Sequence, residues 1–169
     1  MSQQAKILIC IPCKNRKSIA QECIPTIKAF KAPQDVLRCY NDGSSEYDAE
    51  WLKGIGADWA IDCIPLGIEG QRRLHFTDFS EVKDDFTHLY LTDLDSPHDP
   101  SARAHALYLQ EISGGLPCCL YNTQSHVRLE GNTFEDDERK PYILRRVAPG
   151  VSYLLTRAHV ERIMPFVIT

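Results

Sequence analysis

Two aspartates separated by one residue, Asp93 and Asp95, are the side chains best suited to chemistry, and they follow the apolar segment 86–92. If this segment is a strand that continues through the pair, both carboxylates point the same way, because side chains alternate between faces. Two like charges a few Å apart repel by roughly 4 kcal/mol at an effective dielectric of about 20. A divalent cation would remove this repulsion, and oxygen ligands favour Mg²⁺ or Mn²⁺, which also bind water and substrate phosphates. The alternative is an ordinary turn, since aspartates are common before a proline such as Pro97.

Other polar residues follow the remaining predicted strands. Apolar segments at 6–12, 35–41 and 59–64 are typical of strands, and ligands bind beyond the carboxyl ends of parallel strands. The polar groups are Asn15 and Arg16 after the first strand, Asp42 after the second, Asp93 and Asp95 after the fourth, and Arg72 and Arg73 on the helix before the fourth. Each also has a plainer interpretation, as a turn residue, a helix cap or a solvated side chain. Their shared edge favours a site for a nucleoside diphosphate compound.

Strands and helices alternate through the first two thirds of the chain. Helices are predicted over 18–30, with Ser18 as N-cap and either a kink or a break into two short helices at Pro25, and over 47–53, 67–83 and 101–112. This alternation is typical of right-handed βαβ units on a parallel sheet. Later segments predict strands at 116–122, 142–147 and 151–156, a charged loop at 128–140 and a helix at 157–164. We therefore predict an α/β fold with a mixed, mainly parallel sheet flanked by helices.

Composition limits the classes of protein to which the chain can belong. Its 169 residues suffice for one domain with a real core, and a formal net charge of −4 argues against nucleic-acid binding. No apolar run reaches the ~18 residues of a membrane span, and the polar start lacks the apolar region of a signal peptide, so we predict a cytoplasmic protein. Most of the seven cysteines lie in apolar segments, as buried thiols do in a reducing compartment. A redox role for Cys10 and Cys13 is disfavoured because Cys10 belongs to the strand itself.

Four segments in order resemble the motifs of GT-A glycosyltransferases, most closely the family 2-like group. They are ICIPCKNR at 9–16, NDGSS at 41–45, GIEGQRR at 67–73 and LTDLD at 91–95. The segment PGVSYLLTR at 149–157 is similar to the strand and helix start that follow in many such enzymes. The resemblance covers roughly the first hundred residues.

This resemblance implies roles for individual residues. Pro12 and the loop with Asn15 and Arg16 would line the nucleoside. Asp42 would contact the base or ribose, and Arg72 would lie near the donor. Asp93 and Asp95 would form the D-x-D metal pair, in which Asp93 with Leu94 would contact ribose or metal-bound water. The cation, Mn²⁺ or Mg²⁺, would act as a Lewis acid on the departing diphosphate.

The sequence departs from the family where inverting members carry an acidic general base. No acidic pair follows the strand predicted at 151–156, and Glu161 is the acid found there. The base could lie beyond residue 169 or elsewhere in the chain, or the enzyme could retain configuration. Internal candidates are Asp136 and Asp137, next to Glu135. Two further catalytic candidates, His126 and His98, could assist the acceptor or the metal. Each of these residues also has a structural interpretation.

The sequence as a whole predicts a metal-dependent glycosyltransferase, hexosyltransferase-like, that uses a nucleoside-diphosphate-sugar donor, most simply a UDP-sugar, and a glycan or other hydroxyl acceptor. Residues 1–100 would form the donor half of a single domain and residues 101–169 the acceptor half, in what could be the N-terminal part of a longer protein. Two alternatives stay open. One is a sugar-nucleotide nucleotidyltransferase, against which the glycine-free loop after the first strand argues. The other is a domain that binds a nucleotide sugar or glycan without turnover.

Overall fold

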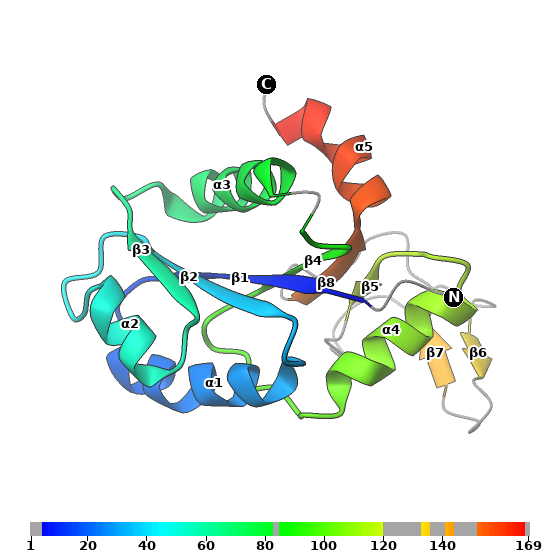
Figure 1. Cartoon of the computed structure of the whole chain (residues 1–169), viewed down its shortest axis with the longest axis horizontal. Helices are drawn as coiled ribbons and strands as arrows, with labels where there is room; N and C mark the ends of the chain where they lie inside the picture. Colours follow the sequence, from blue (N-terminus) through cyan, green and yellow to red (C-terminus); the bar gives the residue numbers. More distant parts are fainter. Residues whose placement is uncertain (1–4, 83–84, 120–132, 136–140, 144–151, 168–169) are drawn as a thin grey trace.

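The computed structural model describes residues 5–82, 85–119, 133–135, 141–143 and 152–167, and its centre is a mixed six-stranded sheet (Figure 1). The strands lie in the order β3-β2-β1-β4-β8-β5. Their bounds are β1 Ile7–Cys13, β2 Val36–Asn41, β3 Trp59–Asp62, β4 His88–Thr92, β5 Cys118–Cys119 and β8 Ser152–Thr156. The helices are α1 Lys17–Phe30, α2 Ala49–Ile55, α3 Gly67–Glu81, α4 Ala102–Ile112 and α5 Arg157–Val167.

Four neighbouring strands, β3, β2, β1 and β4, run parallel. Each consecutive pair is joined through a helix, so their carboxyl ends meet at one edge of the sheet. β8 runs antiparallel to β4, with Leu91 opposite Tyr153, and β5 runs antiparallel to β8. The predicted class, an α/β fold with a mixed and mainly parallel sheet, is confirmed.

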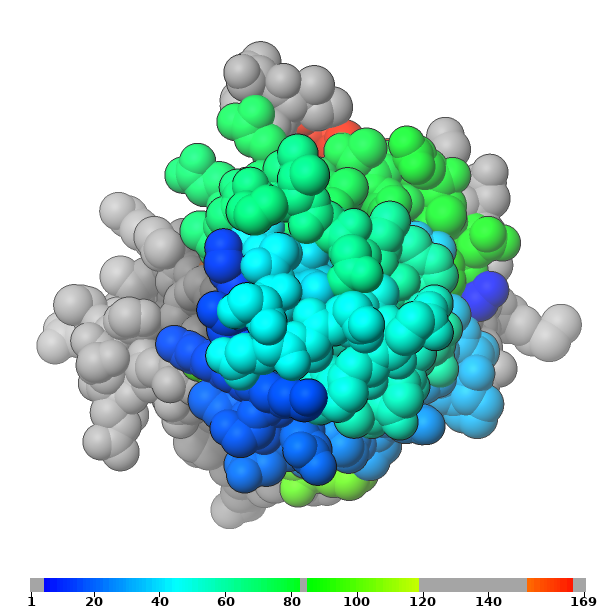
Figure 2. Space-filling view, turned by 90° about the vertical axis from the view of Figure 1, so that its left-hand side faces the viewer, coloured from blue at the N-terminus to red at the C-terminus, as the bar shows by residue number. Residues whose placement is uncertain are grey.

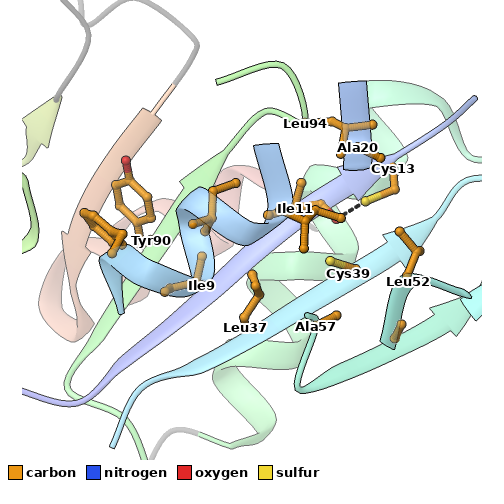
Figure 3. Packing of buried hydrophobic residues seen from close by; sticks show 14 of the residues in the cluster. Ile9, Ile11, Cys13, Ala20, Leu37, Cys39, Leu52, Ala57, Tyr90 and Leu94 are labelled. Carbon is orange, nitrogen blue, oxygen red and sulfur yellow. Dashed lines mark hydrogen bonds between the residues drawn. The ribbon is translucent and has the colours of Figure 1, made fainter. Parts of the chain in front are cut away.

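Both faces of the sheet are covered, which explains the continuous apolar run in β1. Ile7, Ile9 and Ile11 face α1, α2 and α4, while Leu8 and Cys10 face α3 and α5. Figure 1 shows these two helical layers on opposite sides of the strands, and Figure 3 shows Ile9 and Ile11 packed with residues of β2 in the first layer. Alternate side chains of a buried parallel strand serve different layers, so every position must be apolar.

The first helix differs from its prediction at its start. Helix α1 begins at Lys17, with Arg16 at the N-cap in the left-handed conformation, so Ser18 lies within the helix and is not its cap. The helix continues through Pro25, an exposed residue, as one element. Its buried stripe of Ala20, Ile24 and Ile27 packs on the sheet, and such packing supplies most of a helix's stability in proteins.

The charged segment predicted as a loop contains a short strand. β6, Thr133–Glu135, pairs antiparallel with β7, Pro141–Ile143, which overlaps the strand predicted at 142–147. The loop prediction for 128–140 was therefore wrong for the three residues of β6, because pairing between short strands overrides a polar sequence. Burial raises the pKa of the Cys10 thiol to about 12, as expected for a buried apolar cysteine.

Within the described ranges, no helix combines the length and apolar character that a bilayer crossing requires.

Candidate functional site

The candidate site lies at the carboxyl edge of the parallel strands, which faces the viewer in Figure 2. The loop after β1, in blue, lies there beside the cyan residues that follow β2 and the green start of α3. Asp93 and Asp95 follow β4 at the same edge. The structure thus brings the predicted strand-end residues together on one side of the molecule.

Asp42 follows β2 and is buried, with 4% of its surface exposed. Its carboxylate accepts hydrogen bonds from the Leu66 N–H at 2.5 Å, the Gly67 N–H at 3.2 Å and Gln71 Nε2 at 3.0 Å. Lys14 Nζ lies 3.5 Å from the same carboxylate. Both oxygens of Asp42 therefore hold the loop and helix start that follow β3.

The Asp-Gly turn makes this arrangement possible. Gly43 has a φ of +70°, and a Cβ there would lie 2.6 Å from Cγ of Pro65, so glycine is required on both grounds. Burial alone would raise the pKa of Asp42, but the hydrogen bonds from Leu66, Gln71 and Gly67 and the charge of Lys14 outweigh it, and the pKa is lowered. Asp42 is therefore a carboxylate stabilised by the fold itself.

The loop between β1 and α1 contains two consecutive left-handed residues that are not glycine, Asn15 at φ 51° and Arg16 at φ 57°. This conformation costs of order 1 kcal/mol or more for each residue, and it persists only where other contacts hold it. Asn15 Oδ1 accepts a hydrogen bond from the Ser45 N–H at 3.1 Å, and the Ser44 hydroxyl lies 3.2 Å from the same oxygen. The Tyr47 hydroxyl donates to the Asn15 carbonyl at 2.7 Å. The segment after β2 therefore holds the loop in a fixed form.

This fixed loop directs Arg16 to Asp95. The guanidinium Nη1 lies 2.9 Å from Asp95 Oδ2, and the two side chains are 62% and 51% exposed. The sequence interpretation expected Arg16 to line the nucleoside or to cap a helix, and it did not anticipate this ion pair. Asp95 already has a cationic partner that belongs to the chain.

Asp93 and Asp95 do not lie on one continuous strand, which corrects the reason given for their common direction. β4 ends at Thr92, and Leu94 and Asp95 form a turn closed by the Ser96 N–H donating to the Asp93 carbonyl at 3.3 Å. The two carboxylates still influence each other. Burial raises the pKa of the half-buried Asp93, and the charge of Asp95 adds to this rise, while Arg72 opposes it.

A pocket lies beside Asp93, between α3 and the ends of β1, β4 and β8. It is lined by Pro12, Ile68, Arg72, His75, Leu91, Thr92, Asp93 and Tyr153. The Arg72 guanidinium lies over the Tyr153 ring, 6.0 Å from its centroid. Pro12, Arg72 and Asp93, three of the predicted residues, thus share one pocket.

Sequence reasoning missed Tyr153 and His75 in this pocket, and Lys14 and Gln71 beside Asp42. Tyr153 lies on β8, which joins the edge only through antiparallel pairing with β4. His75 is one turn after Arg72 on α3, and a helical projection of that segment could have placed it there. Burial lowers the pKa of His75 to about 3, with Arg72 adding to the effect, so the imidazole is neutral at physiological pH.

The two aspartates offer a donor set that fits a hard divalent cation. Their carboxylates supply oxygen ligands, and the negative charge of Asp95 adds to the rise in the pKa of Asp93 that burial causes. Among the described residues, no group of three or more His, Cys, Asp and Glu side chains is placed to hold a metal. A cation at Asp95 would therefore take further ligands from water and from a bound phosphate, as Mg²⁺ usually does.

Two further candidates have structural surroundings. The Leu94 side chain is buried in the core and lies near Ala20 in Figure 3, outside the pocket lining. His98 has Nδ1 2.6 Å from the Ser96 carbonyl and Nε2 2.7 Å from the Tyr90 hydroxyl. Because a carbonyl can only accept, Nδ1 carries the proton and Nε2 accepts from Tyr90. His98 therefore anchors the loop that contains Asp93 and Asp95 to Tyr90 of β4.

The predicted catalytic residues Asp136, Asp137 and His126 lie outside the described residues. Glu135 belongs to β6, but its side chain is also outside the description. Glu161 lies exposed on α5.

Comparison with known proteins concerns the fold. No protein-family model and no curated protein matches this sequence. Among solved structures, the chain is similar to the glycosyltransferase TarS of S. aureus, in a crystal structure of residues 1–349, with 11% identity and a TM-score of 0.52. The match covers 63% of this chain and 32% of that chain. It supports a glycosyltransferase-like fold.

Proposed function

We propose that this domain binds a nucleoside-diphosphate sugar with a divalent cation and transfers the sugar to a hydroxyl acceptor. The observation that carries the proposal is that Pro12, Arg72 and Asp93 line one pocket at the carboxyl edge of a parallel sheet, with Asp95 two residues further along the same loop. This edge is where open α/β sheets bind ligands. The glycosyltransferase-like fold of the chain also supports this proposal.

The residues of the pocket suggest how a donor would be held. Arg72 offers a planar, always charged guanidinium that suits the oxygens of a diphosphate. Pro12, Ile68 and Tyr153 supply an apolar wall beside it. Because His75 is buried and neutral, Arg72 supplies the positive charge on this side of the pocket.

Asp93 and Asp95 are the residues that would hold Mn²⁺ or Mg²⁺. When bound, the cation would neutralise charge on the leaving diphosphate. Asp42 acts indirectly in this proposal. By binding the Leu66 and Gly67 N–H groups and Gln71, it fixes the start of α3 and so orients Arg72.

The proposal is tested by thermal unfolding of the full chain with UDP, GDP and their sugars, with and without Mn²⁺. A ligand that binds only the folded state stabilises it by RT ln(1 + [L]/Kd), so the melting temperature rises with the ligand concentration. We expect a nucleoside diphosphate to stabilise the chain in the presence of Mn²⁺, and this Mn²⁺-dependent stabilisation should be lost in Asp95→Ala. Asp99→Asn is the matched control, because Asp99 is an exposed acid on the same loop that accepts a hydrogen bond from Ser101; it should bind as the wild type does.

Unchanged nucleotide binding in Asp95→Ala would remove the metal from the proposal. If no nucleoside diphosphate stabilised the wild type in any condition, donor binding itself would be refuted. Release of UDP from a bound UDP-sugar, followed by transfer to a hydroxyl acceptor, would distinguish an enzyme from a binding domain. Asp136, Asp137 and His126 are the first residues to substitute in that assay.

A further inference from the structure

The ion pair between Arg16 and Asp95 places an internal cation where the proposed function requires an external one. Asp95 Oδ2 is 2.9 Å from Arg16 Nη1, within the range of a charge-assisted hydrogen bond. Any cation that binds this oxygen must displace the guanidinium or share the carboxylate with it.

The loop around Arg16 is built to hold its backbone and leave its side chain exchangeable. Asn15 and Arg16 are both left-handed, and Ser44, Ser45 and Tyr47 hold Asn15 in place. The Lys17 N–H is likewise held, by Glu46 at 2.8 Å. In contrast, the Arg16 side chain is 62% exposed, and an exposed ion pair contributes little to stability.

The neighbouring basic side chains have other partners. Lys14 is paired with Asp42, and the Lys17 ammonium lies over the Trp51 ring, 5.0 Å from its centroid. Three of the four residues at 14–17 are basic, and Arg16 is the one that pairs with Asp95. Its planar fork also suits phosphate better than an ammonium does.

We propose that Arg16 occupies the cation's place on Asp95 and is exchanged for the divalent ion when the donor binds. The released guanidinium then binds phosphate oxygens of the donor. This inference rests on the proposed function and adds a regulatory contact to it: Arg16 neutralises Asp95 in the empty site, and it opposes metal binding until phosphate offers the guanidinium another partner.

The test measures Mn²⁺ and UDP binding separately, by isothermal titration calorimetry on the full chain. Arg16→Gln should bind Mn²⁺ alone about two- to fivefold more tightly than the wild type, the range set by an exposed ion pair. With saturating Mn²⁺, the same variant should bind UDP several-fold more weakly. Lys17→Gln is the matched control, because it removes one positive charge from the adjacent residue, which does not pair with Asp95 in the structure; both affinities should stay near the wild-type values.

A second pair of variants tests whether Arg16 binds UDP once it is released from Asp95. Without metal, Asp95→Asn should bind UDP more tightly than the wild type, since Arg16 has lost its partner, and adding Arg16→Gln should remove that gain. Equal Mn²⁺ affinity in Arg16→Gln and the wild type, or equal changes in Arg16→Gln and Lys17→Gln, would overturn the exchange. A wild type that binds both Mn²⁺ and UDP with no effect of Arg16 leaves the proposed function standing. If the wild type binds neither ligand, both proposals fail.

Discussion

The two acidic regions at the strand edge are built in opposite ways. After β2, Asp42 is buried and bonded to the backbone of Leu66 and Gly67 and to Gln71. After β4, Asp95 is half exposed and paired with one exposed arginine. One carboxylate is saturated by the fold, and the other is held by a contact that an incoming ligand can replace.

This difference separates two roles that the sequence did not distinguish. A buried carboxylate with several donors contributes to stability, because its removal leaves those donors unsatisfied. An exposed carboxylate contributes little to stability and is available for binding. Asp42 therefore belongs to the frame of the site, whereas the proposed function assigns Asp95 to its chemistry. Substitutions at the two positions should separate stability from ligand binding.

The largest effect should come from Asp42→Ala. Removing the carboxylate leaves the Leu66 and Gly67 N–H groups and Gln71 Nε2 without their acceptor, so the free energy of unfolding should fall by about 2–4 kcal/mol. Urea unfolding measures this change, with Asp95→Ala as the matched control. Similar losses in both variants would contradict the distinction between the two regions.

A smaller effect is expected at the loop that connects the two regions. Asn15→Ala keeps a Cβ in a left-handed residue and removes the acceptor for the Ser45 N–H, so we expect a loss of about 1–2 kcal/mol. Asn15→Gly removes the same acceptor but relieves the backbone strain, and it should be the milder variant. Urea unfolding of both variants is the measurement, and a milder Asn15→Ala would show that φ at this position does not matter.

A still smaller change in stability is expected for Asp95→Asn. Because the pair with Arg16 is exposed, the free energy of unfolding should change by less than about 1 kcal/mol. The difference from the wild type should shrink further in 1 M salt, where charges are screened over about 3 Å. A loss that persists in high salt would indicate a structural role for Asp95.

The parallel half of the fold was predictable because local signals agree there. The apolar runs of β1 and β2 and the buried stripe of α1 each specify their element, and the strand order brings Asp42 and Asp93 to one edge. Errors arose where backbone conformation departs from these patterns. The left-handed Arg16 displaced the cap from Ser18, and the turn at Leu94 and Asp95 ended the strand early.

The contacts within the site were less predictable, since they join residues far apart in the sequence. Arg16 and Asp95 are separated by 79 positions, and no local pattern connects them. The hydrogen bonds from the Leu66 and Gly67 N–H groups to Asp42 depend on backbone position, to which residue type gives no clue. The sequence therefore predicted which residues share the edge, but not which of them are already paired.

The smallest effect concerns Asp93, whose pKa shift is opposite in sign to that of Asp42. A carboxyl whose pKa is raised on folding disfavours the folded state at pH values above its folded pKa, and this cost disappears as the pH falls below the unfolded value of about 3.8. Asp93→Asn should therefore be slightly more stable than the wild type at pH 7, and the difference should shrink as the pH falls and vanish below about pH 3.8. A lowered pKa acts in the other direction, so Asp42→Asn should lose stability at pH 7, and that loss should shrink in acid. Urea unfolding of both variants between pH 7 and pH 3 measures the two trends. If Asp93→Asn were less stable than the wild type at pH 7, the attraction of Arg72 would outweigh burial, and Asp93 would belong with Asp42 among the residues that stabilise the frame.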